Sequence, residues 1–152
     1  MAEYSANAIQ VVNPGESVVF TETPVPCRRG FIRHRDDTGS FLLSGWVPTK
    51  YGCQNSCATY LVDFGANISI PADGTVGPIS LAITIDGSTI ASSEMIVTPA
   101  AVDQYFNVSR AVNACIWKGC CETIAVRNTS SQPIQVQDAN IIFSRPDLAV
   151  TY

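Results

Sequence analysis

The alternation of side chains in residues 78–87 indicates the class of fold. This stretch reads Pro78-Ile79-Ser80-Leu81-Ala82-Ile83-Thr84-Ile85-Asp86-Gly87. Apolar residues occupy every second position from 79 to 85, and small or polar residues lie between them. This period of two predicts a β-strand with one apolar face. Asp86-Gly87 has the chemistry of a tight turn, so we expect the strand to enter a hairpin.

Similar short segments recur on both sides of this stretch, separated by turns rich in Gly, Pro, Asn and Asp. We expect strands at residues 8–12, 16–20, 30–35, 40–46, 58–70, 90–97, 105–108, 122–128, 134–136 and 140–145, and a cysteine-rich strand and loop at residues 114–121. No stretch keeps a helical period over three turns. Many short strands with turns between them predict an all-β sandwich or barrel.

For three segments the sequence predicts a more specific local structure. Residues 23–27 contain two prolines, so we expect an extended connector or an edge strand, because proline cannot donate to a ladder. Gly65 interrupts the long segment 58–70 and is expected to form a bulge where the strand changes its facing. Residues 100–104 are expected to hold one helical turn before a strand.

Length and composition indicate one domain with an unusually neutral surface. The chain has 152 residues, so residues 1–152 are expected to form one domain. Within it, residues 1–27 are interpreted as an N-terminal strand and connector that joins neighbouring subunits. Charged residues are 14% of the chain, against about 25% in ordinary domains. Such a surface is suited to being covered by neighbouring subunits.

Several classes of partner are excluded at this level. The net charge is −4, which argues against a nucleic-acid partner, because phosphate binding needs a basic surface. No apolar run approaches the ~18 residues of a membrane-spanning helix, so no membrane partner is expected. The N-terminus lacks the basic and apolar regions of a signal peptide. We therefore expect synthesis in the cytoplasm and a final location on the surface of a virion or spore.

The order of these elements resembles a known family. Residues 39–43 are similar to the strand before its Gly-x-Tyr turn, 60–68 to its long central strand, 81–90 to its hairpin, and 122–128 and 139–143 to its two C-terminal strands. The last two-thirds of the chain thus resembles the C1q/TNF-like jelly-roll domain of bacterial collagen-like spore-surface protein tips and phage fibre or decoration proteins. The resemblance implies an antiparallel jelly-roll sandwich that forms a homotrimer around an apolar axis. The chain departs from the family in having no collagen-like stalk and many cysteines.

The six cysteines allow three uses. They are Cys27, Cys53, Cys57, Cys115, Cys120 and Cys121, and all are disulfide candidates. The spacing of Cys53 and Cys57 with Cys120 and Cys121 would also suit a tetrahedral zinc site, a weak metal candidate. Reduced, partly buried thiols are the third reading.

A basic cluster holds the candidate ligand contacts. It comprises Arg28, Arg29, Arg33, His34 and Arg35. An anionic glycan, a phosphate or an acidic partner could bind there, with Arg33, His34, Arg35 and Trp117 as the contacts. The competing interpretation is an edge strand protected by charge, with His34 as a solvated strand residue. Trp46 and Trp117 are more readily interpreted as core residues than as sugar-stacking platforms.

Three functions follow from these patterns. The first is a non-enzymatic, self-assembling structural protein without a cofactor, whose partner is itself and also a capsid, a spore coat or a cell-surface glycan. The second is a glycan- or receptor-binding module on the same fold, with residues 48–57 and 113–121 as its contact loops. The third is a cysteine- or zinc-dependent enzyme; His34 is the only histidine and no catalytic signature surrounds any cysteine.

Overall fold

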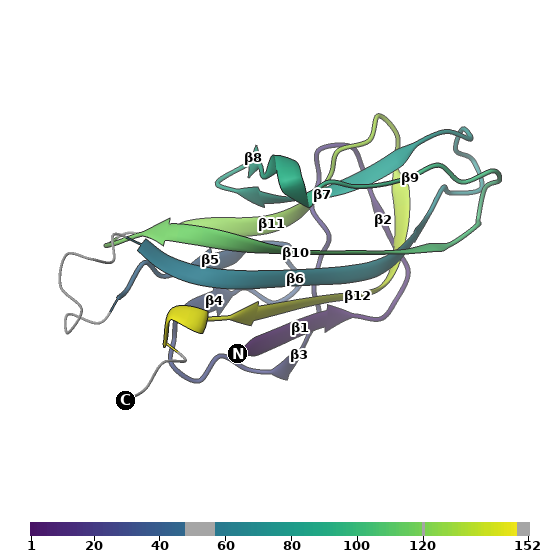
Figure 1. The fold of residues 1–152 in the computed structure, drawn as a ribbon. Coiled ribbons are helices and arrows are strands. Elements are labelled where there is room, and N and C mark those ends of the chain that lie inside the picture. Colours follow the sequence, from purple (N-terminus) through teal and green to yellow (C-terminus); the bar gives the residue numbers. More distant parts are fainter. Residues whose placement is uncertain (48–56, 120, 149–152) are drawn as a thin grey trace.

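Two antiparallel sheets packed face to face form the body of the protein (Figure 1). The structure is a computed structural model that describes residues 1–47, 57–119 and 121–148. Sheet A is six-stranded in the order β10-β6-β12-β1-β3, with β2 also paired to β12. Its strands are β1 (Ala2–Ala6), β2 (Gln10–Val12), β3 (Glu22–Val25), β6 (Cys57–Ser69), β10 (Phe106–Trp117) and β12 (Ile134–Ser144).

Sheet B is also six-stranded, in the order β4-β5-β11-β7-β8, with β9 paired to β7. Its strands are β4 (Ile32–His34), β5 (Phe41–Leu43), β7 (Ile79–Ile85), β8 (Ser88–Thr89), β9 (Met95–Val97) and β11 (Glu122–Asn128). Two 3₁₀ turns, η2 (Ala91–Ser93) and η3 (Pro146–Leu148), complete the described part. The expected all-β class is confirmed, and within the described residues no helix is long and apolar enough to span a membrane.

The core lies between the sheets, where the inward face of β6 packs against rings from both layers. The inward side chains of β6 are all buried: Tyr60, Val62, Phe64, Ala66 and Ile68. The facing of β6 therefore does not change at Gly65, and the expected bulge there is wrong. The irregularity lies in the neighbouring strand β12, where the register shifts between Gln137 and Asn140.

The hairpin expected after β7 is confirmed. Asp86 and Gly87 have φ angles of 47° and 83°, and Ile85 pairs with Ser88, so these two residues form the turn between β7 and β8. Positive φ at both positions matches the twist of the flanking strands, as in type I′ turns.

The second face of β7 is buried as well, although its residues are polar. Ser80 and Thr84 are 8% and 1% exposed. Their hydroxyl groups are satisfied, because Ser80 lies 2.6 Å from the Thr129 hydroxyl and Thr84 donates to the Ala125 carbonyl. Hydroxyl groups that make such bonds can be buried at little cost.

The N-terminal segment pairs within its own chain. Residues 1–27 supply β1, β2 and β3 to sheet A, and the proline-containing β3 lies at the sheet edge, as residues 23–27 were expected to do. Residues 16–20 form no strand; isolated bridges join Ser17 to Arg127 and Phe20 to Thr38. Residues 100–103 bend and turn without a helix before β10 begins.

Candidate functional site

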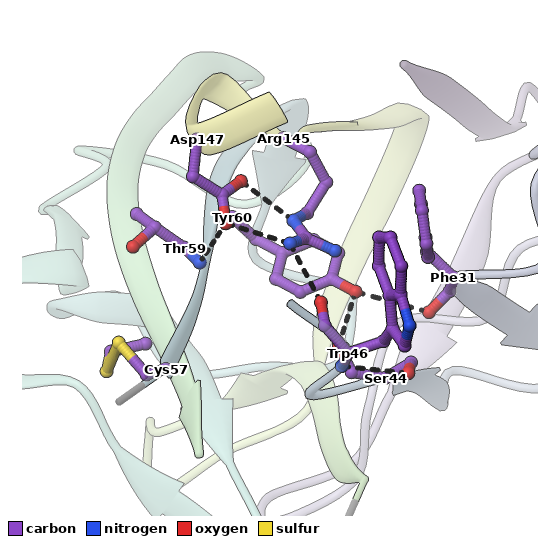
Figure 2. A network of polar contacts seen from close by, with 9 residues as sticks. Phe31, Ser44, Trp46, Cys57, Thr59, Tyr60, Arg145 and Asp147 are labelled. Atoms are coloured by element: carbon purple, nitrogen blue, oxygen red, sulfur yellow. Dashed lines mark hydrogen bonds and ion pairs between the residues drawn. A yellow bond between two sulfur atoms is a disulfide. The ribbon is translucent and has the colours of Figure 1, made fainter. Parts of the chain in front are cut away.

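One arginine joins several segments of the chain at one end of the sandwich (Figure 2). Arg145 follows β12, and its Nε and Nη2 atoms donate to the Asp147 carboxylate at 2.9 and 2.8 Å. Nη2 also donates to the Trp46 carbonyl at 3.0 Å. The guanidinium carbon lies 4.9 Å from the Phe31 ring centroid and 4.8 Å from that of Tyr60, within cation–π range.

Arg145 and Asp147 each favour the charged form of the other. Burial alone would raise the pKa of Asp147, but hydrogen bonds from Arg145 and from the Thr59 backbone N–H outweigh it and hold that pKa below its ordinary value. Burial lowers the pKa of Arg145, yet the Asp147 carboxylate more than offsets this and the pKa is raised. Burial raises the pKa of the Tyr60 hydroxyl, which donates to the Ser44 carbonyl at 2.6 Å.

A cavity of about 450 Å³ lies beside this network. Arg28, Arg29 and Arg145 contribute its charged lining, and Phe31 and Leu148 contribute apolar surface. We call this hollow the arginine cavity. Its lining comes from the connector between β3 and β4, from the end of β12 and from η3, which are distant in sequence.

The predicted ligand residues Arg33, His34 and Arg35 lie at strand β4, on the edge of sheet B. Arg33 and Arg35 are exposed. His34 is packed, because its ring stacks on Phe41 at 4.3 Å and its two nitrogens lie 3.1 and 3.2 Å from the carbonyl oxygens of Ser40 and Phe20. The interpretation of His34 as a solvated strand residue is therefore wrong.

The two tryptophans lie at the surface, so the expectation of core positions is wrong. Trp46 is 51% exposed and stacks on Phe31 with the ring centroids 5.6 Å apart. Trp117 is 62% exposed and ends β10 in sheet A, opposite Cys57. It thus lies on the other sheet from Arg33. Residues 48–56, which the sequence also suggested as a contact loop, lie outside the described residues.

Two of the disulfide candidates are paired. Cys57 and Cys115 form a disulfide between β6 and β10, with their Cα atoms 5.5 Å apart. This pairing removes Cys57 from the candidate zinc set, because a disulfide sulfur is no thiolate ligand. Cys27 is partly buried and Cys121 exposed, and both are free thiols. Cys53 and Cys120 lie outside the described residues, and the described part holds no group of three or more metal-ligating side chains.

The outer face of sheet A is a second candidate surface, and it carries few charges. The side chains that point outward from β6, β10 and β12 are mainly Asn, Gln, Ser and Thr. The charged residues among them are Asp63 and Asp138, which is exposed at the register shift in β12, and Glu3 of β1 lies beside Ile142. Some of the amides bond to one another, as Asn107 Nδ2 does to Asn67 Oδ1 at 3.2 Å. Leu61 lies among them and is 37% exposed. We call this surface the neutral face.

Sequence reasoning did not identify the Arg145 network. The pattern Arg145-Pro146-Asp147 was available as a signal, since a proline that begins a turn directly after a strand can bring its two charged neighbours together. Nothing local in the sequence indicates that Tyr60 and Phe31, far away in the chain, provide the rings that enclose the guanidinium.

Strand order and packing define the class as an antiparallel jelly-roll sandwich. No protein-family model and no curated protein sequence matches the chain. Solved structures share its fold. The globular domain of zebrafish complement 1qA matches at 13% identity over 93% of this chain and 94% of that chain, with a TM-score of 0.57. Eiger TNF from S. frugiperda matches at 13% identity over 95% and 90%, with a TM-score of 0.63.

Murine APRIL matches at 10% identity over 92% of this chain and 97% of that chain, with a TM-score of 0.51. The protein therefore has the C1q/TNF-like jelly-roll fold, as the resemblance in the sequence implied. At these identities the likeness is one of fold alone.

Proposed function

We propose that this protein is a non-enzymatic structural protein that assembles with copies of itself through the neutral face, on the surface of a particle such as a virion or spore. The observation that carries the proposal is the composition of the neutral face, where most outward side chains of β6, β10 and β12 are neutral amides and hydroxyls and the charges are Asp63 and Asp138. Charged residues are depleted in the centres of protein interfaces, because their desolvation is costly.

The geometry of the neutral face supports this assembly. Leu61 in β6 pairs with Ser144, and Asp63 pairs with Ile142 in β12. The apolar side chains of Leu61 and Ile142 therefore lie diagonally opposite each other on neighbouring strands. Asn113 and Ser144 flank Leu61, whereas Asp63 and Glu3 flank Ile142. The amides and hydroxyls of this face can form hydrogen bonds with a second copy. Within the protomer, β3 from the N-terminal segment borders this sheet and offers a further contact to a neighbour. A homotrimer is the assembly that the family resemblance implies.

The disulfide supports a final location outside the reducing cytoplasm. Disulfides persist in oxidising environments, which include virion and cell surfaces. Cys57 and Cys115 join the edge strand β10 to its neighbour at one end of the sandwich.

Native mass measurement with and without reductant tests the proposal. We expect a trimer that persists in reductant and that Leu61→Glu converts to monomer, because a buried unpaired carboxylate would be costly. Ile96→Glu is the matched control, since Ile96 is an exposed apolar residue, 60% accessible, on β9 of sheet B. A wild-type monomer at all concentrations would overturn the proposal.

A second candidate function is recognition of a glycan or receptor. It is favoured by the exposed arginines Arg28 and Arg29 and by the exposed ring of Trp117. Saturable binding on a glycan array that is lost in Arg28→Ala/Arg29→Ala or in Trp117→Ala would support it.

A further inference from the structure

We propose that the arginine cavity binds the anionic group of an acidic saccharide, with Arg28 and Arg29 as direct ligands and Arg145 as a fixed charge in the wall. This inference deepens the second candidate function and rests on it. No outward side chain of β6, β10 or β12 lines the cavity, which meets the edge of sheet A at Val25 of β3.

The first support is an imbalance of charge around the cavity. In the part of the chain that the structure describes, the single salt bridge joins Arg145 to Asp147. Arg28 and Arg29 line the same cavity, are exposed, and bond to none of the described residues. The lining therefore carries two positive charges without a protein counter-charge. Two neighbouring guanidinium groups suit a carboxylate, sulfate or phosphate, which each can bind in a bidentate manner.

The second support is an unsatisfied atom in the wall. The Arg145 side chain is 7% exposed, and its Nη1 atom is enclosed without an acceptor among the described residues. A buried polar group in this state costs about 1–3 kcal/mol and needs an explanation. Asp147 bonds to Nε and Nη2 and leaves Nη1 without an acceptor, so an anion held by Arg28 and Arg29 would add compensating charge to the wall that Arg145 helps to form.

The size and lining of the cavity favour a small ligand with an apolar surface. Its volume of about 450 Å³ falls within the ~300–1,000 Å³ that is usual for small-molecule sites. Val25, Phe31 and Leu148 provide apolar wall beside the arginines. A sugar acid or sugar ester fits this mixture, because its C–H face can contact the apolar wall while its anionic group meets the guanidinium groups.

A long polyanion such as a nucleic acid fits less well. The whole chain has a net charge of −4, and Asp36 and Asp37 directly follow Arg35 beyond β4. The arginines of residues 28–35 therefore form two small groups, at the cavity and at the β4 edge, whereas nucleic-acid binding needs an extended basic surface. The structure thus favours a ligand of one or two anionic groups.

Titration followed by NMR of ¹⁵N-labelled protein tests the inference. The probes are D-glucuronate, D-glucose 6-phosphate and D-glucose 6-sulfate, with D-glucose as the neutral control; the anionic probe that binds identifies the anion. We expect saturable binding of at least one anionic probe and none of glucose. Arg28→Gln/Arg29→Gln should weaken binding on the order of tenfold or more, which corresponds to about 1.4 kcal/mol.

A matched variant controls for loss of charge alone. Arg33→Gln/Arg35→Gln removes the same two charges from the β4 edge, outside the arginine cavity. It should change the affinity less than about twofold, because these charges are solvent-screened. Native mass should show both double variants in the wild-type oligomeric state, so a failure of binding is distinguishable from a failure of assembly.

Thiol labelling provides a second readout. Cys27 lines the cavity, whereas Cys121 does not. A bound saccharide should slow iodoacetamide modification of Cys27 and leave that of Cys121 unchanged. The inference is overturned if no anionic probe binds, if glucose binds equally well, if both double variants lose binding to the same degree, or if a short DNA oligonucleotide binds more tightly than the saccharides.

Discussion

At the level of single residues, Arg145 links separate segments of the chain at this end of the sandwich, as a second disulfide could. Its guanidinium bonds to Asp147 in η3 and to the carbonyl of Trp46, and it lies between the rings of Phe31 and Tyr60. Three segments that are distant from Arg145 in sequence, at Phe31, Trp46 and Tyr60, thereby contact one planar group. Both charges are largely removed from water, so each needs the other.

Removing Asp147 should destabilise the protein. We expect Asp147→Asn to lower the free energy of unfolding by about 2–3 kcal/mol, less than the ~3–5 kcal/mol of fully buried pairs, since 17% of the Asp147 side chain stays exposed. Chemical denaturation at pH 7 measures this. Asp73→Asn, in an exposed turn, is the control and should change stability by less than about 0.5 kcal/mol. Equal effects of the two changes would contradict the role given to the ion pair.

The same pair also predicts a dependence on pH. The pKa of Asp147 is lower in the folded protein than in the unfolded chain, so its stabilising contribution is complete above the unfolded value of ~3.9 and is lost as the pH falls through the folded value. Denaturation curves between pH 3 and 7 should show the wild-type advantage over Asp147→Asn shrinking at the acidic end.

At the level of elements, the turn between β7 and β8 requires a left-handed backbone. Gly87 has φ +83°, a conformation that an L side chain adopts with strain. Gly87→Ala should therefore cost about 1 kcal/mol, measured by thermal or chemical denaturation. Gly77→Ala is the matched control, because nothing lies within 4 Å of a Cβ there, and its effect should stay within about 0.5 kcal/mol. A neutral Gly87→Ala variant would show that the loop adopts another turn.

Alternation of apolar and polar residues predicted the long strands, and it failed where tertiary contacts decide. The period of two located β6, β7 and β11, and the residue pair Asp86-Gly87 located the turn. It also predicted a strand at residues 16–20, where Val18 N–H bonds to the Val126 carbonyl but no continuous ladder forms. The bulge was predicted at Gly65 in β6. The register shift lies instead in β12, where Asp138 has a positive φ angle. Sequence pattern does not say which of two paired strands carries the extra residue.

The candidate site was partly accessible to sequence reasoning. The arginines of residues 28–35 were identified as a cluster from their proximity along the chain. The structure divides them between the arginine cavity and the β4 edge, and it adds Arg145 from the far end of the sequence. That division depends on how β3, β4 and η3 meet, which is a property of the packed sheets.

At the level of the whole molecule, the Cys57–Cys115 disulfide makes the free energy of unfolding depend on whether the surroundings are oxidising or reducing. Cys57 and Cys115 are 58 residues apart, and closing a loop of that length in the unfolded chain stabilises the fold by about 4 kcal/mol in the chain-entropy model. We expect Cys57→Ser/Cys115→Ser to lower the free energy of unfolding by about 2–4 kcal/mol and to match the wild type in reductant. If reductant destabilises this variant as much as the wild type, another disulfide carries the effect.

The central position of β12 has a consequence for biosynthesis. This strand pairs with β1, β2 and β6, which all precede it in the chain, so sheet A can close only after β12 has been synthesised. Contacts between such distant parts of a chain form slowly, because a long loop must be ordered before they stabilise anything. The nascent polypeptide therefore exposes its apolar strands until β12 emerges, and its yield in cells should depend on chaperones that shield them until then.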